Sequence, residues 1–276
     1  MISISNMNRN IVKIFINVAI LFLLFNSHLG FGQVNVLGRP GHVMTPSADW
    51  TDENNFGLNV SYLPENHAIN FFMGDYFREI IYGFRLGFTD FLELNFNITY
   101  LPDRDRIGIG DRHADVRLRI LKENEKFPAL VLILTPPGSA ANFLSHNALV
   151  ATKHFDVGIG DFSFTLGYSL PYMFEVSRGI GSNLLGDRSL ALVSKKDLNI
   201  RYLNGLFSAF VWTPYSWLGI MGEYDGSALN GGLFLKYKEL AVIQLNAYSF
   251  REIGGSFGLS FPLNFDMKEL RKYEKR

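Results

Sequence analysis

The chain contains no cysteine, which excludes disulfide bridges, thiolate metal sites and a lipid-modified cysteine at a mature N-terminus. Charge is scarce too: 19% of the 276 residues are charged, and 26 basic side chains balance 26 acidic ones. A net charge of zero gives no field that attracts nucleic acid, so we expect no such partner. After the first 32 residues no uninterrupted apolar run of about 18 residues occurs, so we expect no transmembrane helix there.

Aromatic and small residues are abundant instead. The chain has 25 phenylalanines, 12 tyrosines and 26 glycines, and hydrophobic residues make up 47% of it. This composition favours strands over helices, because aromatic side chains fit a pleated surface and glycine is a poor helix former. The sequence therefore indicates an all-β protein.

The first 32 residues have the layout of a secretory signal peptide. Arg9 and Lys13 precede the apolar run 14–25, and small and polar residues follow it up to Gln33. A run of about a dozen apolar residues is short for a membrane-spanning helix, which needs roughly 20, although an uncleaved anchor is the alternative. We expect cleavage near Gly32, export from the cytoplasm, and a mature chain that begins close to residue 33.

Alternation of apolar and polar residues recurs along the rest of the chain. In Phe56–Leu63, the residues Phe56, Leu58, Val60 and Tyr62 alternate with Gly57, Asn59 and Ser61, as in a strand with two unlike faces. We predict further strands at 82–89, 92–100, 115–120, 129–135, 148–153, 162–170, 190–194, 205–213, 217–224, 232–238, 241–249 and 257–263. Turn-forming clusters separate them, among them 102–105 and 230–232.

Two architectures accommodate about a dozen such strands: a soluble sandwich or barrel with an apolar inside, and a transmembrane barrel with an apolar outside. The second is favoured, because the non-aromatic faces carry small and polar residues with occasional Arg and Glu rather than many Lys and Glu. Aromatic residues near strand ends would form interfacial girdles: Tyr62, Tyr82, Tyr100, Tyr168, Tyr172, Trp212, Tyr215 and Trp217. We predict one antiparallel transmembrane β-barrel of about 12 strands over residues 33–265, followed by a charged tail at 266–276.

The densest polar cluster follows Gly110. Asp111 and Arg112, with Asp115 and Arg117 on the next strand, are predicted to form an ion-pair network that faces the lumen and fixes the strand register. The alternative is a contact surface for a sugar or an anion, for which arginine supplies paired donors. Side chains predicted to line the lumen are Arg85, Glu93, Asp115, Arg117 and Arg119. The loops at 64–72 and 179–188 are expected to reach solvent.

Other candidate sites have simpler explanations. Glu223 and Asp225 share one strand face, which suits calcium or an acid pair, but Asp225 begins an Asp-Gly turn and is better explained by that turn. The six histidines lack zinc spacing, and the glycines near 158 and 179 lack a dinucleotide motif. A lipid hydrolase built on Ser145 and His146 is a further alternative, although no nucleophile-elbow motif is present. We expect no enzyme, no metal and no cofactor.

Several motifs, in order along the chain, resemble the YjbH family of outer-membrane proteins, which are associated with export of exopolysaccharide in Gram-negative bacteria. They are an opening segment at 38–48, a Gly-Asp-Arg motif at Gly110, Asp111 and Arg112, a strand ending in Lys153, and a Glu-Tyr-Asp strand end at Glu223, Tyr224 and Asp225. Family members are often longer, with more than one such β region, so this chain would be a single-unit form.

The resemblance implies a barrel in the outer membrane, in contact with its lipid and with polysaccharide or polysaccharide-export proteins. We therefore expect a non-catalytic role in exopolysaccharide export or assembly. A small porin or solute channel is the second hypothesis, and the lipid hydrolase the third.

Overall fold

The computed structural model describes residues 33–51, 55–104, 110–137, 142–178 and 188–263. The expected signal peptide and charged tail lie outside these ranges. Within them no helix is long and apolar enough to cross a membrane.

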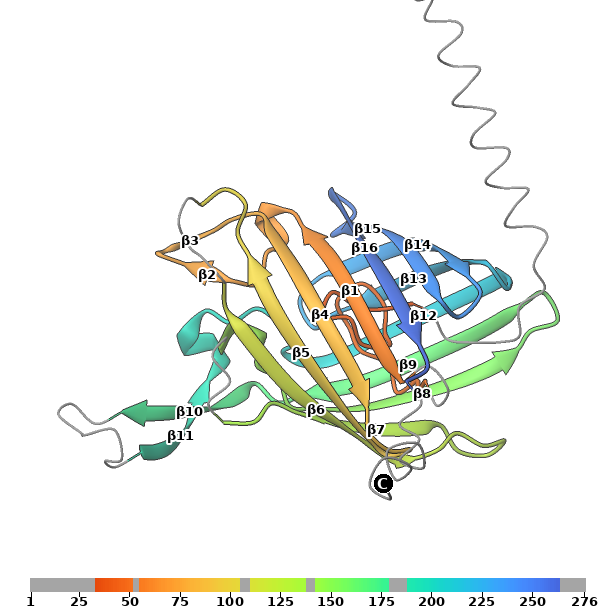
Figure 1. The fold of residues 1–276 in the computed structure, drawn as a ribbon, viewed down its shortest axis with the longest axis horizontal. Helices are drawn as coiled ribbons and strands as arrows, with labels where there is room; N and C mark the ends of the chain where they lie inside the picture. Colours follow the sequence, from red (N-terminus) through yellow and green to blue (C-terminus); the bar gives the residue numbers. More distant parts are fainter. Residues whose placement is uncertain (1–32, 52–54, 105–109, 138–141, 179–187, 264–276) are drawn as a thin grey trace, which may run out of the picture.

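Twelve antiparallel strands close into a barrel (Figure 1). In chain order the barrel strands are β1 (Phe56–Leu63), β4 (Glu79–Gly87), β5 (Leu92–Tyr100), β6 (Arg112–Leu121), β7 (Ala129–Leu134), β8 (Ala148–Asp156), β9 (Asp161–Ser169), β12 (Gly205–Tyr215), β13 (Leu218–Tyr224), β14 (Leu229–Tyr237), β15 (Ala241–Tyr248) and β16 (Glu252–Phe261). β1 closes the barrel by pairing with β16 on one side, where Phe56 faces Phe261, and with β4 on the other. The prediction of an antiparallel barrel of about twelve strands is confirmed.

Two hairpins stand outside the barrel. β2 (Phe71–Phe72) pairs with β3 (Asp75–Tyr76), and β10 (Tyr172–Arg178) pairs with β11 (Arg188–Ser194); both project from the same end of the barrel in Figure 1. The predicted strand at 190–194 was wrong as a barrel strand, because it lies in the second hairpin. Short 3-10 turns occupy Glu65–His67, Asn142–Leu144 and Lys195–Leu198.

The two ends of the barrel differ. At one end, here called the turn end, the connections are 88–91, 122–128, 157–160, 216–217 and 238–240. At the other, the loop end, the longer connections are 64–78, 101–111, 135–147 and 170–204, beside the tight turns 225–228 and 249–251. Bacterial outer-membrane barrels show the same asymmetry, with short turns on the periplasmic side and longer loops outside.

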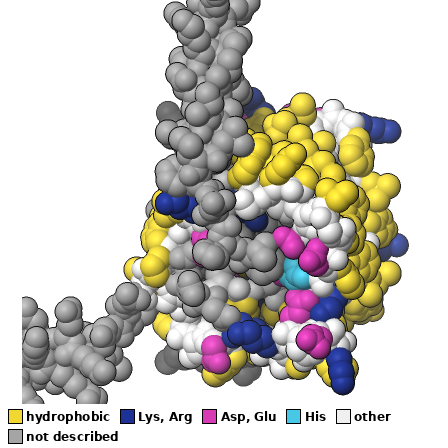
Figure 2. All heavy atoms as spheres, turned by 90° about the vertical axis from the view of Figure 1, so that its right-hand side faces the viewer, with side chains coloured by type: hydrophobic (Ala, Val, Ile, Leu, Met, Phe, Trp, Pro, Cys, Tyr) yellow, Lys and Arg dark blue, Asp and Glu magenta, His cyan; other side chains and the backbone are white. Residues whose placement is uncertain are grey.

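The outer face of the barrel is apolar. Phe84 on β4, Leu166 on β9 and Leu245 on β15 are outward-facing side chains that are 42%, 46% and 55% exposed. Among the described barrel strands, the charged side chains at outward positions are Arg112 and Lys153, and each lies toward an end of its strand. Figure 2 shows the hydrophobic flank, with charged side chains gathered at the end that faces the viewer.

Aromatic side chains mark both rims of this surface. Exposed aromatics near the loop end are Tyr62, Tyr100, Tyr168, Tyr172 and Tyr224, and those near the turn end are Phe88, Phe91, Phe127, Phe155 and Tyr215. Girdles of this kind place amphipathic rings at the two edges of a lipid layer. Of the residues predicted for them, Trp212 and Trp217 are half-buried, and the Trp212 indole N–H donates to the Ile159 carbonyl over 2.9 Å.

Candidate functional site: a lumen filled by the N-terminal segment

Residues 33–50, here called the plug, occupy the barrel lumen, where they form the red-orange segment enclosed by the strands in Figure 1. Every residue from 33 to 49 is buried. The segment has neither helix nor strand, and it folds on itself through backbone hydrogen bonds such as Val36 N–H to the Val43 carbonyl (3.0 Å) and Ser47 N–H to the Pro40 carbonyl (2.9 Å). The lumen is therefore occupied by a compact piece of the chain itself.

Asn35 and Gly38 explain the local shape of the plug. The Asn35 side-chain oxygen accepts the backbone N–H groups of Leu37 (3.0 Å) and Arg39 (3.3 Å), as in an Asx turn. Gly38 has a φ of +78° and packs against Asn59 of β1, whose Oδ1 would lie 1.7 Å from an added Cβ. A side chain at Gly38 would therefore meet both backbone strain and a clash with the barrel wall.

Glu223 on β13 is the main anchor of the plug. Its carboxylate accepts three consecutive backbone N–H groups, those of Val43 (3.1 Å), Met44 (2.7 Å) and Thr45 (3.0 Å). The Thr45 hydroxyl (2.7 Å) and the Asn230 amide (2.9 Å) add two further donors. A buried carboxylate with this many donors keeps its charge compensated, and each such hydrogen bond is stronger than one between neutral groups.

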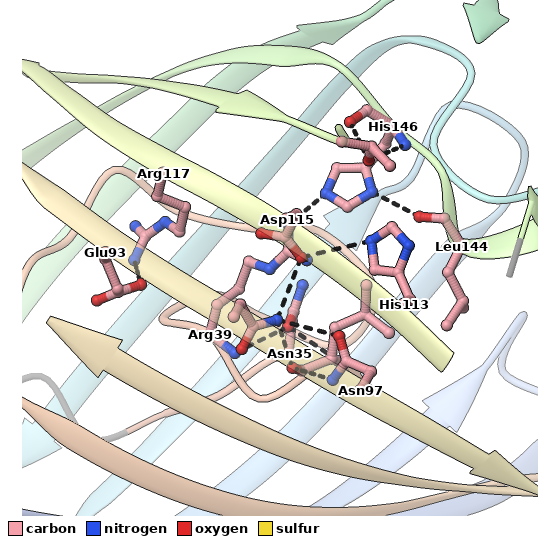
Figure 3. A network of polar contacts seen from close by, with 12 residues as sticks. Asn35, Arg39, Glu93, Asn97, His113, Asp115, Arg117, Leu144 and His146 are labelled. Atoms are coloured by element: carbon pink, nitrogen blue, oxygen red, sulfur yellow. Dashed lines mark hydrogen bonds and ion pairs between the residues drawn. The ribbon is translucent and has the colours of Figure 1, made fainter. Parts of the chain in front are cut away.

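Arg39 carries the plug's buried positive charge (Figure 3). Its guanidinium donates to the Asp115 carboxylate of β6 and to Nε2 of His146. Nδ1 of His146 lies 2.7 Å from the Leu144 carbonyl, so the neutral tautomer with its proton on Nδ1 satisfies both ring nitrogens. Burial and the neighbouring Arg39 lower the pKa of His146 well below its usual value, which keeps the ring in this acceptor form.

A second charged group lies nearer the turn end. The Glu93 carboxylate on β5 takes Arg85 on one oxygen (3.2 Å) and Arg117 on the other (2.6 Å). Arg117 also donates to the plug carbonyls of Ser47 (3.0 Å) and Asp49 (2.9 Å). These three charges lie on the neighbouring strands β4, β5 and β6, and Arg117 also holds plug carbonyls, so the network fixes both the strand register and the position of the plug.

Neutral side chains hold the rest of the plug. Gln244 of β15 accepts Val34 N–H (2.8 Å), Thr152 of β8 accepts Ala48 N–H (2.8 Å), and the Tyr202 hydroxyl donates to the Met44 carbonyl (3.1 Å). Asn95 and Asn97 of β5 both donate to the Leu37 carbonyl, over 3.1 and 2.8 Å. The anchors come from strands on all sides of the barrel, so the plug is held as a fitted part of the lumen.

Apolar plug residues face a different wall. Val36, Leu37, Val43 and Met44 join a buried cluster with wall residues from β7, β8, β12 and β14, including Val131, Ile133, Val150, Phe207, Val211 and Phe234. Most lumen-facing side chains of β7, β8 and β12 are apolar, whereas β4 to β6 present charges and amides. The plug likewise has an apolar side and a polar side, and the match of each side to the barrel wall explains how the plug is oriented in the lumen.

The predicted site residues separate into three groups. Asp115, Arg117 and Glu223 face the lumen and contact the plug, and the half-buried Arg119 stacks its guanidinium over Trp50 at 5.0 Å. Arg112 and Tyr224 are exposed on the outer face, so the prediction that Arg112 joins a lumen network was wrong. Asp111 accepts the Asn70 amide (2.8 Å), and Lys153 pairs with Glu123 (3.1 Å) at the turn end.

The remaining candidates serve turns and close packing. Asp225 accepts the N–H groups of Ser227 and Ala228, each over 2.8 Å, and so forms the turn after β13. Gly110 lies against β5, where an added Cβ would be 1.7 Å from the Thr99 carbonyl oxygen. The described residues contain no group of three or more acidic, His or Cys side chains that could hold a metal ion.

The sequence did not reveal the plug itself. Asn35, Arg39 and Gln244 were not predicted as site residues, and His146 was considered only for a hydrolase. The plug has no periodic pattern, and its hydrogen-bond partners in the rest of the chain lie 58 to 210 positions away. The strand faces did contain a signal for the plug. Charged residues at lumen positions, such as Asp115, require partners of opposite charge, and Arg39 lies in the segment between the expected cleavage site and β1.

The fold and the site define a closed β-barrel with an apolar exterior and a lumen filled by its own N-terminal segment. The chain belongs to the YjbH family, described as "Exopolysaccharide biosynthesis protein YbjH", whose model matches residues 33–274. Comparison with curated proteins gives no match. Among solved structures, the chain is similar to the COG4313 outer membrane channel from Pseudomonas putida F1, with 12% identity, a TM-score of 0.37, and coverage of 77% of this chain and 97% of that one.

Proposed function

We propose that this protein is a non-catalytic outer-membrane barrel that takes part in exopolysaccharide export or assembly, and that its lumen is closed in the described state by the plug. The family supports the connection with exopolysaccharide. The uncharged apolar belt with aromatic rims supports insertion in a lipid layer, because exposed apolar surface of this extent is otherwise rare on a protein in water. The observation that carries the proposal is the belt around a plugged lumen.

A catalytic role has little support from the lumen. Ser145 and His146, the pair considered for a lipid hydrolase, are both buried, and both ring nitrogens of His146 are engaged, by Arg39 and by Leu144. A serine hydrolase needs an imidazole nitrogen free to take the serine proton. We therefore favour a role through shape and binding.

A constitutively open porin is the alternative, and the plug argues against it. With residues 33–49 buried among lumen side chains, solute passage requires the plug to move. In planar bilayers we expect the intact protein to be closed for most of the recording. Stable conductance of the intact chain would favour the porin.

Two experiments test the proposal. Fractionation of the expressing cell should recover the protein with the outer membrane, with a gel mobility that changes on boiling, as closed barrels commonly show. Deletion of the gene should reduce surface exopolysaccharide, and restoration of the intact chain should recover it. Recovery in the soluble fraction, or unchanged polymer in the deletion strain, would contradict the proposal.

A further inference from the structure

A groove at the loop end, outside the plugged lumen, has the chemistry of a binding site. It is lined by Phe71, Tyr76, Lys196, Asn199, Ile200, Arg201, Asn204 and Ser227 and has a volume of about 560 Å³, within the range of small-molecule sites. These residues come from the β2–β3 hairpin, from the segment after β11 and from the β13–β14 turn. The groove therefore forms only when three loops distant in sequence come together.

The charge in this groove is positive. Lys196 and Arg201 are its charged lining residues, and both are exposed. Asp225 lies in an adjoining smaller cavity that shares Arg201 and Ser227, but its carboxylate is occupied by Ser227, Ala228 and Asn230. Two exposed cations with no acid in the lining favour an anionic ligand.

Arg201 is held in place before any ligand arrives. Its guanidinium stacks on the Tyr76 ring at 3.7 Å from the centroid, and its Nη1 reaches the Asn66 carbonyl at 3.5 Å. The Tyr76 ring packs in turn against Phe71, with 5.0 Å between centroids, and its hydroxyl donates to the Asn199 carbonyl (3.3 Å). A guanidinium fixed by stacking on one face loses less entropy when the N–H donors along its edge meet a carboxylate.

Neutral groups complete the lining. Asn199 and Ser227 offer amide and hydroxyl groups, whereas the Asn204 amide donates to the Ile200 carbonyl (2.8 Å) and helps to shape the segment. The segment 195–204 is held in place by the buried Lys195, whose ammonium donates to the carbonyls of Tyr202 (3.1 Å) and Leu203 (2.9 Å). Such a mixture of fixed cation, amides, hydroxyl and aromatic edges matches a sugar that bears both hydroxyl and carboxylate groups.

We propose that the loop-end groove binds an acidic polysaccharide through its uronic acid residues, with the carboxylate on Arg201 and Lys196 and the hydroxyls on Asn199 and Ser227. This proposal rests on the proposed function, since it assigns the polymer to a site on the barrel. Met44 of the plug and Tyr202, which donates to the Met44 carbonyl, line the adjoining cavity, so the bound polymer lies next to the plug.

Binding of alginate oligomers to the full chain in detergent micelles tests the proposal directly. The oligomers should bind in low salt, weaken as salt is raised, and outcompete neutral dextran oligomers. Arg201→Gln should weaken binding about tenfold or more, and Lys196→Gln should weaken it less, because a lysine is a mobile point charge. Arg251→Gln, an exposed arginine in the β15–β16 turn of the same end, is the matched control and should bind as the parent does.

Arg201→Lys distinguishes a loss of binding from a folding defect. It keeps the positive charge but lacks the planar fork, so it should bind with intermediate affinity. Equal binding of dextran and alginate, or equal loss in Arg201→Gln and Arg251→Gln, would overturn the proposal. Arg201-dependent binding of lipopolysaccharide or phosphate without binding of alginate would overturn it too, in favour of a lipid headgroup. Polymer secretion is measured separately in the deletion strain. If the protein binds alginate but the deletion strain secretes polymer normally, the proposed function is wrong and the proposed binding site in the groove is still supported.

Discussion

Glu223 joins two parts of the chain that lie about 180 residues apart, because a single carboxylate accepts the N–H groups of Val43, Met44 and Thr45. Glu223→Gln keeps the size of the side chain but replaces one acceptor oxygen with an NH₂ group that faces these donors. We expect the plugged state to lose about 1.5–3 kcal/mol, the range of a hydrogen bond to a charged group. Amide hydrogen exchange at residues 43–45 should become faster, and bilayer recordings should show more frequent opening.

The control for this prediction is Glu65→Gln, an exposed glutamate of the loop end. It removes the same charge at the same end of the barrel and should leave exchange at 43–45 unchanged. Unchanged exchange in Glu223→Gln as well would mean that the plug is held mainly by its apolar side.

Arg39 is the second residue on which the plug depends. Replacement by methionine leaves the buried Asp115 carboxylate without its guanidinium partner, and loss of one member of a buried ion pair typically costs about 3–5 kcal/mol. We expect a lower urea midpoint for Arg39→Met, and partial recovery when Asp115→Leu is added, because the second change removes the unpaired charge. Arg251→Met, an exposed arginine, serves as control and should leave the midpoint unchanged; failure of the double variant to recover would show that His146 or shape dominates.

Residue types could be predicted better than residue partners. Alternation placed Arg85, Glu93, Asp115 and Arg117 on the inner faces, since the side-chain period of a strand is two. It could not show that Asp115 meets Arg39, because that pairing depends on how an aperiodic segment packs in the lumen. Asn230 and the two glycines after it were predicted as a turn but lie in β14, where an added Cβ at Gly232 would be 2.5 Å from the Met221 methyl carbon. Glycine is required here because a side chain would clash with a neighbouring strand, and the local sequence does not reveal that contact.

At the scale of elements, the plug combines a fixed position with a titratable interior. Burial lowers the pKa of His42 from 6.5 to about 4, although its Nδ1 lies 3.0 Å from the Thr45 hydroxyl. Between these two values a hydrated, released plug binds more protons than the seated plug, so the stability of the seated plug rises with pH in this window. The contribution of His42 to this stability is lost as pH falls from about 6.5 to about 4, and it does not change further below pH 4.

The expected loss from His42 is about 3 kcal/mol, because its pKa falls by about 2.5 and each pKa unit corresponds to about 1.36 kcal/mol. Conductance should therefore increase on acidification to pH 4, and the protection of plug amides should decrease once exchange rates are corrected for their intrinsic pH dependence. His42→Gln keeps a hydrogen-bonding group toward Thr45 without titrating, and should flatten this dependence. Some dependence should remain, because burial lowers the pKa of His146 in the same direction. An identical pH profile in His42→Gln would assign the effect to other groups.

Strands whose residues alternate regularly between apolar and polar were predicted correctly, whereas segments whose structure depends on tertiary contacts were not. The expected strand 56–63 coincides with β1, and 92–100 with β5, because both alternate over their whole length. Residues 190–194 were a less regular strand candidate, and they pair with β10 to form a hairpin outside the barrel. Periodicity reports a strand with two unlike faces; it does not report which strand lies beside it.

At the scale of the whole molecule, the apolar exterior distinguishes a barrel in lipid from a barrel in water. Leu233 lies at the middle of β14 and Leu229 at its loop-end edge, and the two side chains are 48% and 61% exposed on the outer face. If the belt contacts lipid, Leu233→Arg places a charge near the middle of the bilayer and should cost about 2–4 kcal/mol, whereas Leu229→Arg near the interface should cost about 0–1.

Urea unfolding of the two variants in lipid vesicles measures this difference, and the pair controls for side-chain size, strand and outward orientation. In water both positions would be ordinary exposed surface, where substitutions usually change stability by about 0.5 kcal/mol or less. A large cost at Leu233 with a small one at Leu229 therefore supports the membrane-spanning barrel. Equal and small effects at both positions would mean that the apolar belt is covered by something other than lipid, and the outer-membrane role would fail with it.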